Sequence, residues 1–467
     1  EVCIEKVRPM EDRVSIGMCL YFGLLYNSGG NCQSYYGKAD FEETAAMTGV
    51  TGQDIVRCKA NLMDMKISVI SSHKISVRAV VLVTVSAEEI YDREVIKKIE
   101  MDNVRDERLE VRMMKLIANR KDTFRIRESV NINQGMSNIG EIIWHELRVK
   151  DFCFTPADGR IDVKGNLSFF VIYQGENGGE LNYYDNVVPF SGSLDISNGR
   201  QEDVYDINIV SCEKSLISRN DGNGETRIFD GEIIMSLDIC GYRNEDVSLL
   251  TDIYAPGYEI TPKTEKLEYE RLVENKVVDI DINERIKNED GGKIIYTCGD
   301  VIVDEIIQKD NKVDIEGTIS VQIMMEDKDA IPPITVSHHD IPFSYQAGMD
   351  KYEKDSELCG KVNNISLYSK RISDKEISVN GTIKMEIMAK STTTTPVVIN
   401  ADVEKVPKEK LKNIPGITGY IVKEGDTLWN IAKRFYTTAD SIMEANNLEN
   451  DMIYPGMKLI ILKLYCF

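Results

Sequence analysis

The sequence predicts a mainly β protein, made of tandem antiparallel modules of the β-sandwich type and a small βααβ domain at the C-terminal end. Three long segments alternate between apolar and polar residues, which is typical of strands with one buried face. They begin at Arg13, Arg160 and Lys312. Their starts lie roughly 150 positions apart, and a period of this length indicates repeated domains, not a solenoid. From about residue 418, apolar residues recur at the helical period instead.

Each repeat is expected to contain the same succession of elements. After the first alternating strand comes a short hinge, with the sequence Pro-Phe-Ser in the second and third copies and a degraded version in the first. A closing strand follows and runs on into a second alternating stretch. The hinges are residues 189–191, 342–344 and 40–41, and the closing strands are residues 227–231, 376–381 and 74–79. Gly165, Gly317 and Gly381 stand inside these strands, where glycine indicates a bulge or a close backbone approach.

The second and third copies also share a leader, an alternating stretch that precedes the module at residues 124–130 and 278–284. The first copy opens directly at Val2 without one, and we interpret this difference as a truncation that leaves out the first leader. The predicted domains are three β modules, a polar linker and the C-terminal domain. Their bounds are 1–92, 93–245, 246–390, 391–417 and 418–463. The polar linker is expected to let the C-terminal domain move relative to the repeats.

Composition argues against several classes of protein. The formal net charge is −21, and a nucleic-acid binder would need a basic face to neutralise phosphates. No run of 18 apolar residues occurs, so no membrane span is predicted. The ten cysteines are scattered without a C-x-x-C pair, so their spacing is not that of a zinc site. They are interpreted as small buried residues in a reducing compartment, with late cross-linking in an oxidised material as the alternative.

No catalytic constellation stands out, and no enzyme, cofactor or metal site is predicted. The metalloprotease, serine-hydrolase and P-loop motifs are absent, and the chain has four histidines. His145 and Cys153 are expected on separate strands, which disfavours a Cys–His dyad. The acidic stretch at residues 221–225 has oxygens at calcium-loop spacing, but position six lacks the required glycine. A hairpin turn explains it better.

The C-terminal domain has clear local signals. A short strand at residues 420–422 precedes a helix with apolar residues at Leu428, Ile431 and further helical positions, capped by Asp426 or Thr427. A second helix at residues 439–445 ends at two asparagines, a residue type that tolerates the left-handed conformation. A Pro-Gly turn then leads into a closing strand at residues 458–462.

This string resembles the LysM family at Tyr-x-Val-x-x-Gly-Asp-Thr-Leu-Trp-x-Ile-Ala, at Ala-Asn-Asn and at Ile-Tyr-Pro-Gly. The resemblance implies a shallow groove for N-acetylglucosamine chains between two loops, or a surface that docks a protein. The implied groove residues are Gly425, Asp426, Thr427, Leu428, Ile453, Tyr454 and Pro455. Trp429 is expected in the core more than in the groove, and Asp426 serves equally well as a helix cap.

The repeats, with their leaders and Val-x-Val-x-Gly-x-Leu strands, resemble the SPOCS domain of spore coat and cortex assembly proteins. Tandem SPOCS repeats with a terminal LysM domain are similar to the SipL-like spore morphogenetic proteins of clostridia. The usual leader proline is absent near residues 131–137.

The resemblance implies a non-enzymatic adaptor at the forespore surface in the mother-cell cytoplasm, or in the spore coat. The β modules would act as scaffold and self-association unit, and the LysM domain would dock on the ATPase of the coat basement layer or on another coat protein. A peptidoglycan-binding wall protein is the alternative, and a wall hydrolase is a third, weaker one.

Overall fold

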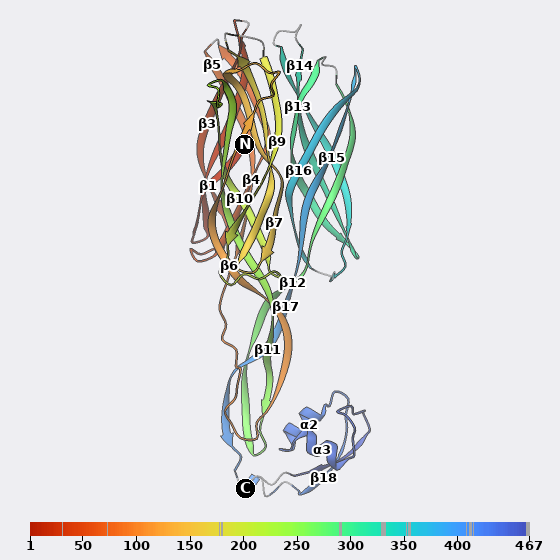
Figure 1. The fold of residues 1–467 in the computed structure, drawn as a ribbon. Helices are drawn as coiled ribbons and strands as arrows, with labels where there is room; N and C mark the ends of the chain where they lie inside the picture. The colour runs from red at the N-terminus through yellow and green to blue at the C-terminus, as the bar shows by residue number, and fades with distance from the viewer. Residues whose placement is uncertain are drawn as a thin grey trace. The chain divides into compact units, whose positions relative to one another are not determined.

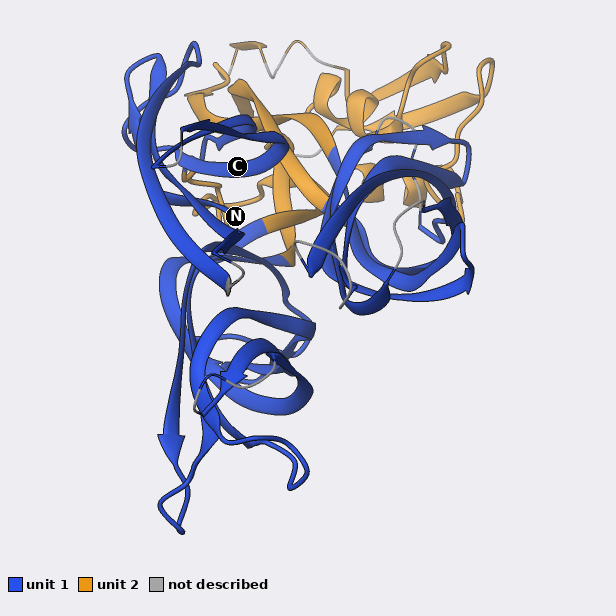
Figure 2. Cartoon of the chain, turned by 90° about the horizontal axis from the view of Figure 1, so that it is seen from above, with its two compact units in different colours: residues 1–91, 115–243, 272–391 blue, residues 92–114, 244–271, 392–467 orange. Residues whose placement is uncertain are grey.

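The computed structural model describes the chain except residues 30, 72, 177, 179–180, 289–291, 328–332, 352, 354–355, 408, 411–412, 414 and 464–467. By its contacts the chain divides into two compact units (Figure 2). Unit 1 comprises Glu1–Tyr91, Lys115–Arg243 and Leu272–Ser391, and unit 2 comprises Asp92–Met114, Asn244–Arg271 and Thr392–Phe467.

The same pair of sheets occurs three times along the chain (Figure 1). The first sheet of each pair is a three-stranded antiparallel meander, with one of the alternating segments as its central strand. These meanders consist of β1 (Val2–Met10), β2 (Arg13–Ser28) and β3 (Asn31–Ala46); of β7 (Ile139–Ala157), β8 (Arg160–Gly175) and β9 (Leu181–Asp195); and of β13 (Lys293–Lys309), β14 (Lys312–Glu326) and β15 (Ile334–Gly348). All three predicted segments are therefore central strands of antiparallel sheets; β14 alternates in burial along most of its length, whereas residues 167–173 of β8 are buried on both faces.

The second sheet of each pair is built on a long hairpin. In the second and third copies the leader strand joins this hairpin, so that the strand orders are β10-β11-β6 and β12-β17-β16. In the first copy the sheet has two strands, β4 and β5. The hairpin strands are β4 (Ile55–Ser71), β5 (Lys74–Glu88), β10 (Val204–Asn220), β11 (Thr226–Tyr254), β16 (Glu357–Ser373) and β17 (Glu376–Lys405), and the leader strands are β6 (Arg105–Asn131) and β12 (Tyr258–Lys287).

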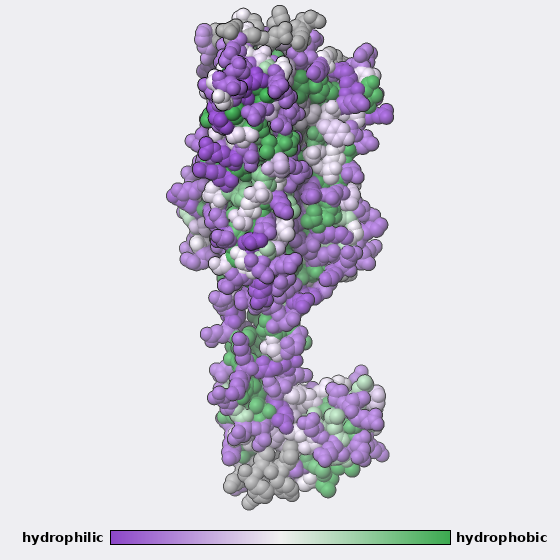
Figure 3. All heavy atoms as spheres, in the orientation of Figure 1, coloured by the Kyte–Doolittle hydropathy of each residue, from purple (hydrophilic) through white to green (hydrophobic). Residues whose placement is uncertain are grey.

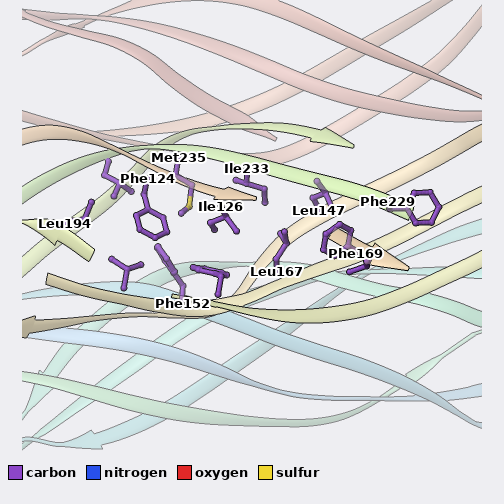
Figure 4. Packing of buried hydrophobic residues seen from close by; sticks show 14 of the residues in the cluster. Phe124, Ile126, Leu147, Phe152, Leu167, Phe169, Leu194, Phe229, Ile233 and Met235 are labelled. Atoms are coloured by element: carbon purple, nitrogen blue, oxygen red, sulfur yellow. The ribbon is translucent and has the colours of Figure 1, made fainter. Parts of the chain in front are cut away.

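Apolar residues from both sheets meet inside each module. In the second copy Phe124 and Ile126 of the leader strand pack with Leu167 and Phe169 of β8 in one continuous cluster. Figure 4 shows these side chains between the strands of the two layers. Full burial of side chains of this size contributes about 1.5–3 kcal/mol each. Alternate residues of β8 lie in this core, which explains the alternating apolar pattern of its sequence.

The glycines inside the strands lie at close backbone or ring approaches, as predicted. Gly165 lies opposite Phe190 in the register of β8 and β9, and an added Cβ would lie 2.7 Å from the Phe190 ring. Gly317 faces Phe343 in the same way. The Pro-Phe-Ser segments are not hinges, however. They lie within β9 and β15, where their phenylalanines cover the glycine of the neighbouring strand.

Three further expectations are corrected or resolved by the strand assignments. The linker expected from residue 391 is strand as far as Lys405, since β17 continues through a run of threonines and valines that favours extended backbone. His145 and Cys153 both lie on β7, not on separate strands. Eight residues of strand separate them by about 26 Å. Residues 221–225 form the turn between β10 and β11, where Asp221 Oδ1 accepts backbone N–H bonds from Asn223 and Glu225. This turn supports the hairpin over the calcium loop.

Within unit 1, aromatic side chains join neighbouring copies. Tyr36 of the first copy stacks on Trp144 of the second, with ring centroids 5.4 Å apart. Phe170 of the second copy stacks on Tyr296 of the third at 4.2 Å. The three copies therefore share apolar contacts besides their separate cores.

Candidate binding site of the C-terminal domain

The C-terminal domain is a two-stranded antiparallel sheet with two short helices between its strands. The elements are β18 (Ile417–Ile421), α2 (Leu428–Arg434), α3 (Ala439–Ala445) and β19 (Lys458–Leu462). Thr427 caps α2, because its Oγ1 accepts the backbone N–H of Asn430 at 3.1 Å. Asn447 has a positive φ of 52°, as its residue type predicted for the end of α3. The βααβ prediction is confirmed.

Two loops lie side by side at one end of this domain. The backbone of Val422 forms hydrogen bonds with Gly456 (2.8 Å) and Met457 (2.9 Å), which brings the loop before α2 next to the loop before β19. Gly425 and Gly456 have φ values of +83° and +88°, which other residues rarely adopt. The glycines of the family motif therefore allow the two tight turns between which the sequence predicts a groove.

Asp426 is engaged within its own loop. Its Oδ2 accepts hydrogen bonds from the Tyr420 hydroxyl at 2.6 Å and from the backbone N–H of Lys423 at 2.8 Å. The hydrogen bond from Tyr420 is the main cause that lowers the pKa of the Asp426 carboxyl. The same hydroxyl accepts a hydrogen bond from Arg434. Asp426 therefore stabilises the loop, and Thr427 caps the helix. The sequence had allowed either residue as the cap.

The predicted groove residues differ in what they can offer a ligand. Tyr454 is 66% exposed, and Gly425, Thr427 and Pro455 are also open to solvent. Leu428 is only 2% exposed and belongs to the core of the domain, against which Ile453 also packs. Thr427, Tyr454 and Pro455 are therefore the members of the predicted set whose side chains a ligand can reach.

Trp429 packs against the core of the domain, as expected, and has a partner that local patterns do not reveal. Its Nε1 donates a hydrogen bond of 2.8 Å to Asp252 of β11, and Lys433 Nζ lies 2.6 Å from the same carboxylate. Tyr254 meets the indole edge to face at 4.7 Å. Burial raises the pKa of Asp252, but the bonds from Lys433 and Trp429 outweigh it and the pKa is lowered. Within unit 2, the α2 helix is therefore tied to β11.

An exposed apolar sheet face is a second feature that the sequence analysis missed. Ile417 pairs with Leu462 and Gly419 with Ile460, so these residues share the outer face of the sheet. Ile417 is 69% exposed and Ile460 50%, and Ile421 and Leu462 are also exposed. Figure 3 shows hydrophobic residues at the surface of the domain near β18. A signal was present in the sequence, because the closing strand is apolar at consecutive positions and not alternating.

Other clusters of ionisable groups are accounted for by pairing. Glu5, Cys19 and Asp40 bring potential metal-ligand atoms within 4.8 Å of one another. The ammonium group of Lys38 lies 2.9 Å from Glu5 and 3.1 Å from Asp40, so both carboxylates are paired with it. His145 lies beside Tyr36, whose hydroxyl is 3.4 Å from its Nδ1. Among the described residues, no helix is long and apolar enough to cross a membrane.

Two family models match segments of the chain. The family model of the LysM domain matches residues 420–462, and the family model described as SipL, SPOCS domain matches residues 1–70 and 138–213. The second match falls on the first and second copies of the repeat. Its two segments begin with β1 and at the start of β7, so they cover corresponding parts of the two modules.

Curated relatives match the C-terminal domain alone. A probable N-acetylmuramidase of Lactococcus lactis subsp. cremoris is 48% identical over 44 residues, which are 9% of this chain and 10% of that protein. A probable endopeptidase p60 of Listeria monocytogenes is 56% identical over 39 residues, 8% of either protein. A probable autolysin SsaALP of Staphylococcus aureus is 34% identical over 44 residues, 9% of this chain and 17% of that protein. The matches thus span a small fraction of these relatives. No solved structure matches the chain.

The matched families are binding domains, and the relatives with enzyme names are similar to the LysM region only. The recurring sheet pairs and the βααβ domain agree with these matches in position along the chain. The chain therefore combines SPOCS domain sequence of the SipL type with a C-terminal LysM domain, which is the architecture of a sporulation-related protein.

Proposed function

We propose that this protein is a non-enzymatic adaptor of endospore coat assembly, located at the forespore surface or in the coat. The β modules serve as a scaffold, and the LysM domain docks on a protein partner, the ATPase of the coat basement layer. The domain bounds predicted from the sequence, 1–92, 93–245, 246–390 and 418–463, belong to this proposal. The combination of SPOCS and LysM matches supports a role in sporulation.

The observation that carries the docking role is the outer face of the β18–β19 sheet. Ile417, Ile421, Ile460 and Leu462 expose apolar side chains together on this face. Exposed apolar side chains gathered on one surface are typical of contact sites for proteins. A glycan chain, by contrast, would lie in the groove between the two loops, where the open side chains are Thr427, Tyr454 and Pro455. The two ligand classes therefore use different surfaces of one small domain.

Two single substitutions separate these surfaces. Ile460→Glu places a charge in the centre of the sheet face, and Tyr454→Ala removes a groove side chain that is 66% exposed. Both side chains are solvent-exposed, so the domain is expected to stay folded. Loss of a central interface residue costs about 2 kcal/mol or more, which is at least a roughly thirtyfold weaker complex.

The assay measures binding of the purified chain to the purified basement-layer ATPase and, separately, to purified peptidoglycan. We expect ATPase binding that Ile460→Glu weakens at least thirtyfold and Tyr454→Ala leaves within threefold. Circular dichroism of each variant controls for folding. Saturable peptidoglycan binding that Tyr454→Ala abolishes, together with absence of ATPase binding, would favour a wall-binding protein and refute the proposal.

A further inference from the structure

Two edge strands of neighbouring copies lie side by side in unit 1. β1 is an edge strand of the sheet β1-β2-β3, and β10 is an edge strand of the sheet β10-β11-β6. Lys214 Nζ of β10 lies 2.7 Å from Glu1 Oε2 of β1. Val210, earlier on β10, packs against the core of the first copy, as does Val7 of β1. The two strands therefore run in opposite directions along their contact.

This arrangement brings two cysteines opposite each other. Cys3 follows Glu1 by two positions and Cys212 precedes Lys214 by two, so each cysteine shares a strand face with the charged residue beside it. The backbone N–H of Cys212 donates a hydrogen bond to the sulfur of Cys3. The Cys3 side chain therefore reaches across the contact between the first and second copies to the backbone of Cys212.

Both thiols are shielded from solvent, but to different degrees. Cys3 is 3% exposed, whereas Cys212 is half-buried beside the core of the second copy. Burial is the main cause that raises the pKa of both thiols, that of Cys212 to about 12. Such a thiol is almost entirely protonated at neutral pH, and the thiolate is the reactive form. Oxidation of this pair is therefore slow at neutral pH and faster in alkaline solution.

We propose that Cys3 and Cys212 form a disulfide under oxidising conditions, and that this disulfide joins the first copy to the second. A disulfide needs Cα atoms about 4.4–6.8 Å apart, and the contact between the Cys3 sulfur and the Cys212 nitrogen keeps the two residues close to this spacing. Two of the three staggered χ1 positions place a cysteine sulfur beside its own backbone nitrogen. Rotation of the Cys212 side chain therefore brings its sulfur to the side on which the Cys3 sulfur lies.

The oxidant is a small disulfide such as oxidised glutathione. The thiolate of Cys212, the more exposed of the pair, attacks one sulfur of the oxidant, breaks its S–S bond and releases one glutathione thiolate. The thiolate of Cys3 then attacks the Cys212 sulfur of this mixed disulfide and releases the second glutathione thiolate. The two thiol protons pass to the released thiolates through solvent. Two protein thiols are thereby oxidised, and one glutathione disulfide is reduced to two thiols.

Cys19 is the rival partner, because it is opposite Cys3 in the register of β1 and β2. Its thiol donates a hydrogen bond to the carboxylate of Asp40, which lies on β3. Since β2 is the central strand of this sheet, the Cys19 thiol is directed away from β1. Cys19→Ser keeps a donor for Asp40 and is therefore the matched control for substitution of Cys212.

The test compares the reduced full chain with the chain incubated with oxidised glutathione in mildly alkaline buffer. Free thiols are blocked with N-ethylmaleimide, and proteolytic peptides are identified by mass spectrometry. We expect a peptide pair joined between Cys3 and Cys212. We also expect the equilibrium constant for unfolding in urea to fall about tenfold or more on oxidation, because a cross-link that closes a long loop restricts the unfolded chain.

Dithiothreitol should reverse both effects. Cys212→Ser should abolish both, whereas Cys19→Ser should leave the linked pair in place. A link between Cys3 and Cys19, a disulfide between two chains, or glutathione left on Cys212 without a linked pair would overturn the proposal.

The comparison of oxidised and reduced parent chain needs no substitution, so the result does not depend on whether a serine variant folds. LysM docking is measured with the reduced chain, and its outcome is therefore independent of this pair.

Discussion

Asp206 is expected to be the most sensitive charged position in the contact between the three copies. This carboxylate on β10 accepts a charge-assisted hydrogen bond from Arg57 on β4 and lies 3.1 Å from Lys361 Nζ on β16. The Asp206 side chain is 17% exposed, so most of its solvation is lost. One residue of the second copy therefore holds cations from the first and the third.

The substitution Asp206→Asn keeps the volume and removes the charge. Removal of one partner from a buried ion pair costs about 3–5 kcal/mol, because the remaining charge stays buried without compensation. Arg57 retains a second carboxylate, Glu88, at 3.8 Å. We therefore expect the lower end of this range, a loss of about 3 kcal/mol in the free energy of unfolding at pH 7.

The effect has a defined dependence on pH. Burial raises the pKa of Asp206, but attraction to Lys361 and Arg57 outweighs it and holds the pKa below its ordinary value. A carboxyl with a lowered pKa in the folded state contributes stability above its unfolded pKa of about 3.9, and this contribution disappears as the pH falls through the folded value. The difference between parent and variant should therefore be complete at neutral pH and shrink below about pH 4.

Urea unfolding followed by circular dichroism measures the loss, with Glu202→Gln as the matched control. Glu202 lies 3.5 Å from Arg200, and both side chains are more than half exposed. Exposed pairs contribute about 0–1 kcal/mol. If Asp206→Asn costs no more than Glu202→Gln, or if its cost is the same at pH 7 and pH 3, the reasoning about the buried triad is refuted.

Two further predictions concern packing. Gly381→Ala should destabilise unit 1 by about 1–3 kcal/mol, because the new Cβ would lie 2.0 Å from the Ser366 carbonyl oxygen. Gly135→Ala should be nearly neutral in the same urea titration, because a Cβ added there meets nothing within 4 Å; equal effects would contradict the steric argument. Asp252→Asn should shift the fluorescence of Trp429 to longer wavelength and speed proteolytic release of the LysM domain, since the carboxylate holds the indole and Lys433. Emission and cleavage rates like those of the parent chain would contradict that role.

Much of the LysM domain follows from its sequence. The short strands, the helix positions and the break at Asn447 depend on residues within a few positions of one another, and capping and turn preferences act over that range. The alternation in β2, β8 and β14 is local for the same reason, since it records which face of a strand is buried. The assignment of Asp426 or Thr427 as the cap stayed open, because both have a suitable oxygen and the choice depends on Tyr420.

Local sequence patterns could not predict which strands are neighbours or which distant residues are in contact. No local pattern shows that β6 lies beside β11, that Phe190 covers Gly165 within a strand where a hinge was expected, or that Asp252 holds Trp429 from 177 residues away. These contacts depend on which strands pair, and the pairing is decided by the sum of packing and hydrogen bonding between distant segments. The sequence by itself therefore establishes a β-repeat protein with a LysM domain, whereas the charged cluster around Asp206 and the apolar face of β18–β19 emerge only once the strands are paired.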